Sequence, residues 1–125
     1  MTEKSNLCMN ERILKYLFDV KIAIDEIDSY FIDLDKRFDT YSDNKLLKRA
    51  IERNLEIMGE AINRILKLEP NFHLNNAKKI IGLRNQIIHS YDNISDENIW
   101  GIIVNHLPAL KLEIENLIQQ GMPQK

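Results

Sequence analysis

The sequence predicts an all-α protein that folds as one domain. The expected architecture is an antiparallel, up-and-down bundle of four or five helices. Apolar residues recur at spacings of three and four, which is the period of a helix and not the alternation of a strand. Glycine (4) and proline (3) are scarce among the 125 residues, so long elements with short connections are expected. A chain of this length, 44% hydrophobic, can bury a core without disulfide bonds. We expect one domain over residues 1–125, with its core over about 10–120.

The first predicted helix spans about residues 10–34, with Asn10 as its N-cap. Its buried face consists of Ile13, Leu17, Val20, Ile24, Ile27 and Phe31. The polar segment 35–41 is predicted to be a loop, after which Ser42 is expected to cap a second helix that ends before Pro70. The apolar stripe of that helix consists of Leu47, Ile51, Leu55, Met58, Ile62 and Ile65.

Asn75 is expected to cap a shorter third helix, which ends near the turn at 91–94. Ser95 is expected to cap the fourth, because acids follow it in the first turn and suit the positive end of the helix dipole. The apolar stripe of the fourth helix is Ile99, Ile103, Leu107, Leu110, Ile114 and Leu117. Pro108 lies inside this helix and removes a backbone hydrogen bond, so we expect a kink there. The helix is expected to end at Gly121.

The net charge of −2 conceals a segregation along the chain. Residues 19–43 carry eight acids against three bases, and residues 44–84 carry nine bases against four acids. A basic face is therefore available for nucleic acid or a nucleotide, although the whole molecule would not attract RNA from a distance. The single cysteine, Cys8, excludes an internal disulfide, and no Cys/His cluster has zinc spacing, so neither metal nor cofactor is expected. No membrane span or secretory signal is visible, which predicts a cytoplasmic location.

The most unusual residue of the third helix is Arg84. It falls in the middle of the apolar stripe formed by Ala77, Ile80, Ile81, Ile87 and Ile88. A guanidinium on such a stripe is costly unless it is paired. Either a carboxylate such as Glu60 or Glu56 meets it, or the stripe leaves the core and lines a second surface.

Asn85 and His89 lie one helical turn apart on one flank of the same stripe. An arginine can hold a phosphate by its fork, and a histidine can move a proton near neutral pH, so the pair indicates phosphodiester chemistry. Arg84 and His89 are about 140° apart on an ideal helix, so one copy does not aim them at one point. Fraying of the helix end, or a second copy related by a two-fold axis, would correct this.

Arg84, four intervening residues, His89 and then Tyr91, with Asn85 directly after the arginine, resemble the signature of HEPN-domain proteins. More narrowly, they resemble HepT toxins of bacterial and archaeal toxin–antitoxin pairs. The segments Ala50-Ile51-Glu52-Arg53, Gly59-Glu60-Ala61 and Leu107-Pro108-Ala109-Leu110 add to this likeness, which covers about residues 10–120.

The resemblance implies a homodimeric, metal-independent ribonuclease that cleaves RNA by transesterification, with both motifs facing one cleft. His89 would act as general base or acid, and Arg84 would stabilise the phosphate charge. Asn85 would orient His89 or the phosphate, and Glu60 would support the site. The products would be a 2′,3′-cyclic phosphate and a 5′-hydroxyl. The implied partner is a minimal nucleotidyltransferase antitoxin, which would inhibit the toxin by adding AMP to Tyr91.

Two other hypotheses stay open on the sequence. One is a non-catalytic helical module that binds a nucleotide or a nucleotidyltransferase. The other is a structural dimerisation bundle, in which Arg84 takes part only in an ion-pair network at the interface. His89 could equally be a histidine near the negative end of the helix dipole, and Tyr91 a loop residue that packs its ring on the bundle.

Overall fold

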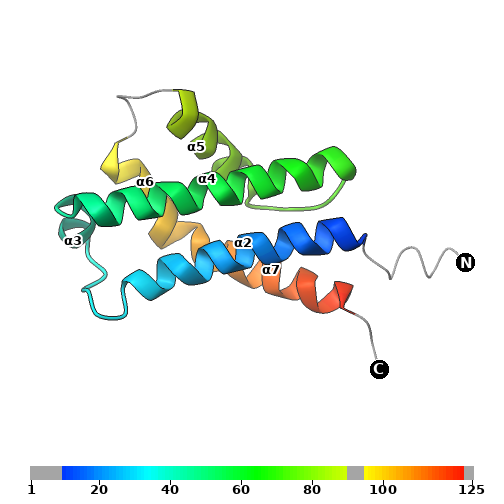
Figure 1. Ribbon diagram of the computed structural model, residues 1–125, viewed down its shortest axis with the longest axis horizontal. Helices are drawn as coiled ribbons and strands as arrows, with labels where there is room; N and C mark the ends of the chain where they lie inside the picture. Colours follow the sequence, from blue (N-terminus) through cyan, green and yellow to red (C-terminus); the bar gives the residue numbers. More distant parts are fainter. Residues whose placement is uncertain (1–9, 90–94, 123–125) are drawn as a thin grey trace, which may run out of the picture.

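The computed structural model describes residues 10–89 and 95–122, and every regular element in these ranges is a helix (Figure 1). The predicted all-α class is therefore confirmed. The described residues form six helices and not four: α2 (Glu11–Tyr30), α3 (Phe38–Ser42), α4 (Lys45–Leu68), α5 (Ala77–His89), α6 (Asp96–Asn105) and α7 (Leu107–Gly121). The turn predicted at 91–94 lies outside the described residues.

Helix α2 begins as predicted, because the Asn10 side chain accepts a hydrogen bond of 2.7 Å from the backbone N–H of Arg12. It ends at Tyr30, four residues before the predicted end. The side chains of Ile32 and Leu34 are exposed, so no buried contact would hold a further turn. The backbone N–H groups of Phe31 and Ile32 instead bond carbonyls three residues back, which tightens the last turn.

The segment predicted to be a loop contains helix α3, and this prediction was wrong. Tyr41 is fully buried, and its ring stacks on Trp100 of α6 with centroids 5.7 Å apart. Phe38 and Phe31 meet the same indole edge-on. This aromatic cluster holds the short helix against α6 through contacts between residues far apart in the chain.

The cap predicted for the second helix was also wrong. Ser42 is the last residue of α3, and its hydroxyl donates to Asp96 at 3.3 Å. The N-cap of α4 is Asn44, whose side chain accepts from the backbone N–H of Leu47 at 3.0 Å.

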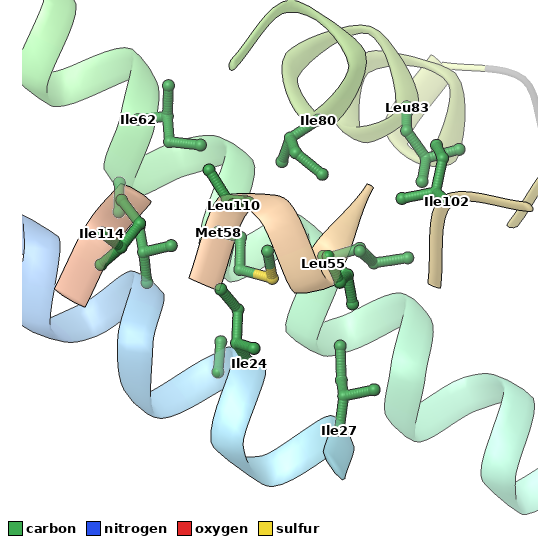
Figure 2. Packing of buried hydrophobic residues seen from close by; sticks show 14 of the residues in the cluster. Ile24, Ile27, Leu55, Met58, Ile62, Ile80, Leu83, Ile102, Leu110 and Ile114 are labelled. Carbon is green, nitrogen blue, oxygen red and sulfur yellow. The ribbon is translucent and has the colours of Figure 1, made fainter. Parts of the chain in front are cut away.

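Helices α2 and α4 run side by side in opposite directions (Figure 1). Their buried stripes match the predicted ones except at Phe31, which follows the last residue of α2 and is only partly buried. Both helices contribute to one hydrophobic core with α5, α6 and α7. Figure 2 shows Met58 of α4 between Ile24 of α2 and Leu110 of α7 at its centre. Asn54 is the one buried polar side chain among the described residues, and it donates to the hydroxyl of Tyr30 at 2.7 Å.

Helix α5 begins at Ala77, slightly later than predicted, and packs chiefly on α4. Asn75 meets Glu113 of α7, whose carboxylate accepts from the Asn75 backbone N–H at 2.7 Å. The predicted stripe holds for Ala77 and Ile80, which are buried, and Leu83 joins them. Ile81 and Ile87 are only partly buried, and the side chain of Ile88 is not among those that the structure describes.

The predicted fourth helix is divided at His106 into α6 and α7, which is a sharper change than the expected kink. Ser95 caps α6 as predicted, accepting from the backbone N–H of Asn98 at 3.0 Å. Pro108 lies in the first turn of α7, where its missing N–H costs no helical bond. Within the described ranges, no helix is both long and apolar enough to cross a membrane.

Candidate functional site

Arg84 lies in α5, on the face that packs against α4. Its Nη2 is 2.7 Å from Oε1 of Glu60, and 23% of its side chain is exposed. The sequence named Glu60 or Glu56 as its candidate partner, and the structure selects Glu60. The pairing offsets the cost of placing the guanidinium beside apolar residues. Arg84 therefore lies at the edge of the core, with one side reaching solvent.

Gly59 allows Arg84 to come this close to α4. A Cβ atom at position 59 would overlap the Cβ of Arg84 and lie 2.7 Å from its Cγ. Even alanine would push the two helices apart, since that contact is shorter than van der Waals separation. Gly59 and Glu60 thus have complementary effects on Arg84. Gly59 leaves space for the aliphatic part of its side chain, and Glu60 pairs with its guanidinium.

The Glu60 carboxylate is shared between two arginines. Its Oε2 accepts from Nε of Arg64 at 2.8 Å, one turn along α4, while Oε1 faces Arg84. Arg64 lines the same groove as Tyr16 of α2, and its guanidinium is the main reason that the pKa of the Tyr16 phenol is lowered. Glu60 therefore joins α4 to α5 through Arg84, and Tyr16 of α2 faces the same groove.

Asn85 binds Arg84 in this structure. Its Oδ1 accepts from Nη1 of Arg84 at 3.2 Å. The sequence expectation was that Asn85 orients His89 or a phosphate. His89 is the last residue of α5, about 7.5 Å along the axis from Arg84. The His89 side chain and all of Tyr91 lie outside the described residues, so Arg84, Asn85 and Glu60 are the predicted site residues that are brought together here.

An open groove of about 700 Å³ runs along these residues between α2 and α4, with Arg84 on its wall. Four cationic side chains line it: Lys15, Arg53, Arg64 and Arg84. Three acids accompany them: Asp19, Glu56 and Glu60. Lys15 pairs with Asp19 at 3.1 Å, so three cations face two acids in the rest of the groove, an excess of one positive charge.

Sequence reasoning missed three contributors to this site. Gly59 was noted only as part of a likeness, Tyr16 was not singled out, and Arg64 was counted only as one base among many. The spacing of Glu60 and Arg64, four residues apart, is a helical ion-pair signal that could have found the last of these. The contact of Arg64 with Tyr16 depends on how α2 packs on α4, which no local pattern reveals.

The fold and the site together define a small helical protein whose arginine, on a buried helix face, reaches a basic groove. Residues 20–117 match the family described as "Ribonuclease HepT-like", and the chain belongs to this family. Membership confirms the resemblance that the Arg84 motif and Gly59-Glu60-Ala61 indicated.

Relatives with similar sequences carry names of the same kind. "Putative RNase MJ1380" of Methanocaldococcus jannaschii is 31% identical over 110 residues, which cover 86% of this chain and 98% of that protein. "Putative RNase MJ0125" of the same organism is 29% identical, over 89% of this chain and 96% of that protein. "Probable ribonuclease HepT" of Thermococcus cleftensis is 27% identical, over 82% and 92%. No solved structure matches the chain at a significant level.

Proposed function

We propose that this protein is the metal-independent endoribonuclease toxin of a toxin–antitoxin pair, cleaving RNA by transesterification with Arg84 and His89. Membership of a ribonuclease family supports the ribonuclease class. The observation that carries the assignment of the site is the position of Arg84, held by Glu60 on the wall of a basic groove with part of its side chain open to solvent. A guanidinium held in this way suits the binding of a phosphodiester.

The proposed reaction needs one proton acceptor, one proton donor and a group that stabilises negative charge. The ribose 2′-oxygen attacks phosphorus and gives up its proton, while the bond to the 5′-oxygen breaks and that oxygen takes a proton. His89 serves as base for the first transfer or acid for the second. Arg84 stabilises the charge that develops on the phosphate oxygens. The products are a 2′,3′-cyclic phosphate and a 5′-hydroxyl.

Cleavage assays in a buffer that contains a chelator test this proposal. Arg84→Ala and His89→Ala are each expected to reduce cleavage by at least about a hundredfold, the usual cost of losing such a group. Arg49→Ala, which changes an exposed arginine near the other end of α4, is the matched control and should cut like the wild type. Equal rates for all four proteins would show that the active-site assignment is wrong.

We further propose that two copies bring their motifs to one cleft, and that a minimal nucleotidyltransferase antitoxin adds AMP to Tyr91. Each AMP would add negative charge and bulk near a site that receives RNA phosphate. The modification is tested by coexpressing this protein with a nucleotidyltransferase encoded beside its gene and then measuring the intact mass of the protein. AMP-sized additions that disappear in Tyr91→Phe are expected, and an active nucleotidyltransferase that leaves the chain unmodified would contradict the proposal.

A second candidate is a non-catalytic helical module, and the ion pair of Arg84 with Glu60 is the observation that favours it. A paired arginine on the edge of a core can be purely structural. In that case Arg84→Ala lowers the free energy of unfolding, no RNA is cut, and binding of a nucleotidyltransferase or nucleotide persists. Measuring stability and cleavage on the same Arg84→Ala preparation separates the two candidates.

A further inference from the structure

Glu60 holds two guanidinium groups at once, one on each oxygen. The Arg84 contact is 2.7 Å and the Arg64 contact is 2.8 Å, so the two arginines, from different helices, lie on either side of one carboxylate. One negative charge is shared by two positive charges. The pair therefore keeps an excess positive charge, and each fork keeps N–H donors that Glu60 does not use.

Arg64 is the more accessible of the two. Its side chain is 55% exposed, against 23% for Arg84, and it lines the same groove. Its hydrogen bond to Glu60 limits the directions in which it can point, and Tyr16 of α2 lines the opposite wall. The raised pKa of Arg64, due first to the Tyr16 contact and then to Glu60, keeps its charge secure. Arg64 is thus a held cation that opens onto the groove beside Arg84.

The groove is larger than one phosphate needs. Its volume of about 700 Å³ lies within the range of sites that hold drug-sized ligands. Arg53 also lines the groove, because Arg53 and Arg64 lie on the same face of α4. A single-stranded segment that enters the groove therefore meets basic side chains at successive points along its backbone.

We propose that Arg64 binds the RNA phosphate adjacent to the one that Arg84 holds, which makes the groove between α2 and α4 a binding site for single-stranded RNA. This inference rests on the proposed ribonuclease function. Arg64 acts in binding and Arg84 in the reaction. Because the ligand is the sugar-phosphate backbone, the site reads charge and single-stranded shape, with no base required.

Binding to an uncleavable RNA tests the site separately from catalysis. The probe is a short single strand with 2′-O-methyl groups at every ribose, titrated by fluorescence anisotropy at several salt concentrations. Arg64→Gln is expected to weaken binding roughly tenfold at low salt, as for loss of a charge-assisted contact. The slope of log affinity against log salt should fall by about 0.7, the value for one phosphate of a single strand.

Two variants complete the comparison. Arg64→Lys keeps the charge and loses the fork, so it should retain the salt slope with reduced affinity. Lys45→Gln is the matched control on the same helix: Lys45 is exposed and lies about 12 Å from Arg53 and about 28 Å from Arg64 along the axis, both beyond the roughly 10 Å screening length of 0.1 M salt. It should leave both the affinity and the slope unchanged.

With cleavable RNA, Arg64→Gln should raise KM and change kcat little, whereas Arg84→Ala should lower kcat. An unchanged salt slope in Arg64→Gln overturns the proposal, and so does a variant that loses only thermal stability or only binding of a protein partner. If the wild type cuts no RNA but Arg64→Gln still weakens binding, the ribonuclease proposal fails and the RNA site stands.

Discussion

At the scale of single residues, two neighbours on α4 have separate effects on Arg84. Gly59 leaves the space that the arginine stem occupies, and Glu60 supplies the charge that its head requires. Asn85 adds a third contact from the same helix as the arginine. The position of one guanidinium therefore depends on three side chains, one of which is only a hydrogen atom.

Replacing Gly59 with alanine should force α5 away from α4. We expect a loss of about 1–3 kcal/mol in the free energy of unfolding, as for overpacking elsewhere, measured by urea denaturation. Gly82→Ala is the control, since a Cβ there meets nothing within 4 Å. It should be neutral, or stabilise α5 by up to about 1 kcal/mol through helix propensity. Equal stabilities for the two variants would contradict the close contact at Gly59.

Glu60→Gln should separate binding from catalysis. The amide still accepts a hydrogen bond but no longer neutralises the arginines, so RNA should bind more tightly while Arg84 is less well oriented. We expect KM and kcat to fall together. The stability cost should be about 1 kcal/mol or less, because both pairs reach solvent. Glu69→Gln, at the C-terminal cap of α4, is the control, and an increase in KM for Glu60→Gln would oppose this interpretation.

At the scale of elements, α2 and α7 are joined by a network of charges. Lys21 meets Asp25 at 2.6 Å and Glu115 at 3.8 Å, and Lys111 meets Asp28 at 3.0 Å and Asp25 at 3.4 Å. The hydrogen bond from Lys21 is the main reason that the pKa of Asp25 lies below its ordinary value of 3.8. Hydrogen bonds to Asp25 and Asp28 raise the pKa of Lys21 and Lys111, respectively, above 10.5.

These shifts predict how stability depends on pH. The lowered pKa of Asp25 gives stability that is present above its ordinary value and lost as pH falls through the folded pKa. The raised lysine pKa values give stability that is present below 10.5 and lost as pH rises through the folded values. The difference in unfolding free energy between wild type and Asp25→Asn should therefore be steady over roughly pH 5–9 and shrink on either side. Asp33→Asn, in an exposed loop, should show little difference at any pH.

Sequence periodicity predicted the elements well where the contacts are local. The stripes of α2 and α4, the caps at Asn10 and Ser95 and the anomaly at Arg84 all follow from spacing along one helix. Helix α3 was not predictable in this way, because the contact of Tyr41 with Trp100 joins residues distant in the chain. The roles of Gly59 and Arg64 were hidden for the same reason, since they depend on how α4 lies against α5 and α2.

At the scale of the whole molecule, one copy offers an arginine and a histidine that an ideal helix aims about 140° apart. A dimer whose motifs share a cleft would correct this, and it makes a prediction about mixed subunits. If Arg84 of one copy works with His89 of the other, a heterodimer of Arg84→Ala and His89→Ala retains one intact site. Mixing the two inactive variants should then restore up to about half of the activity per heterodimer.

The controls for the mixed dimers are the two homodimers alone, each expected to be inactive. Sedimentation or native mass spectrometry should show the dimer in every sample. Dimers that exchange subunits and stay inactive would indicate that each site uses Arg84 and His89 of a single copy. A chain that remains monomeric at the concentrations of the assay would oppose the dimer itself.

The contact between Gly59 and Arg84 also restricts how the sequence can vary. Because the obstacle at position 59 is the Cβ of residue 84 itself, shortening the arginine to alanine would not make room for a side chain there. Only a second glycine, at 84, would do so with the helices in place, and it would remove the guanidinium. Any residue other than glycine at 59 should therefore accompany either a displaced α5 or glycine at position 84. In a comparison of related chains, glycine at the position of Gly59 would therefore indicate that an arginine can pack against α4 at the position of Arg84.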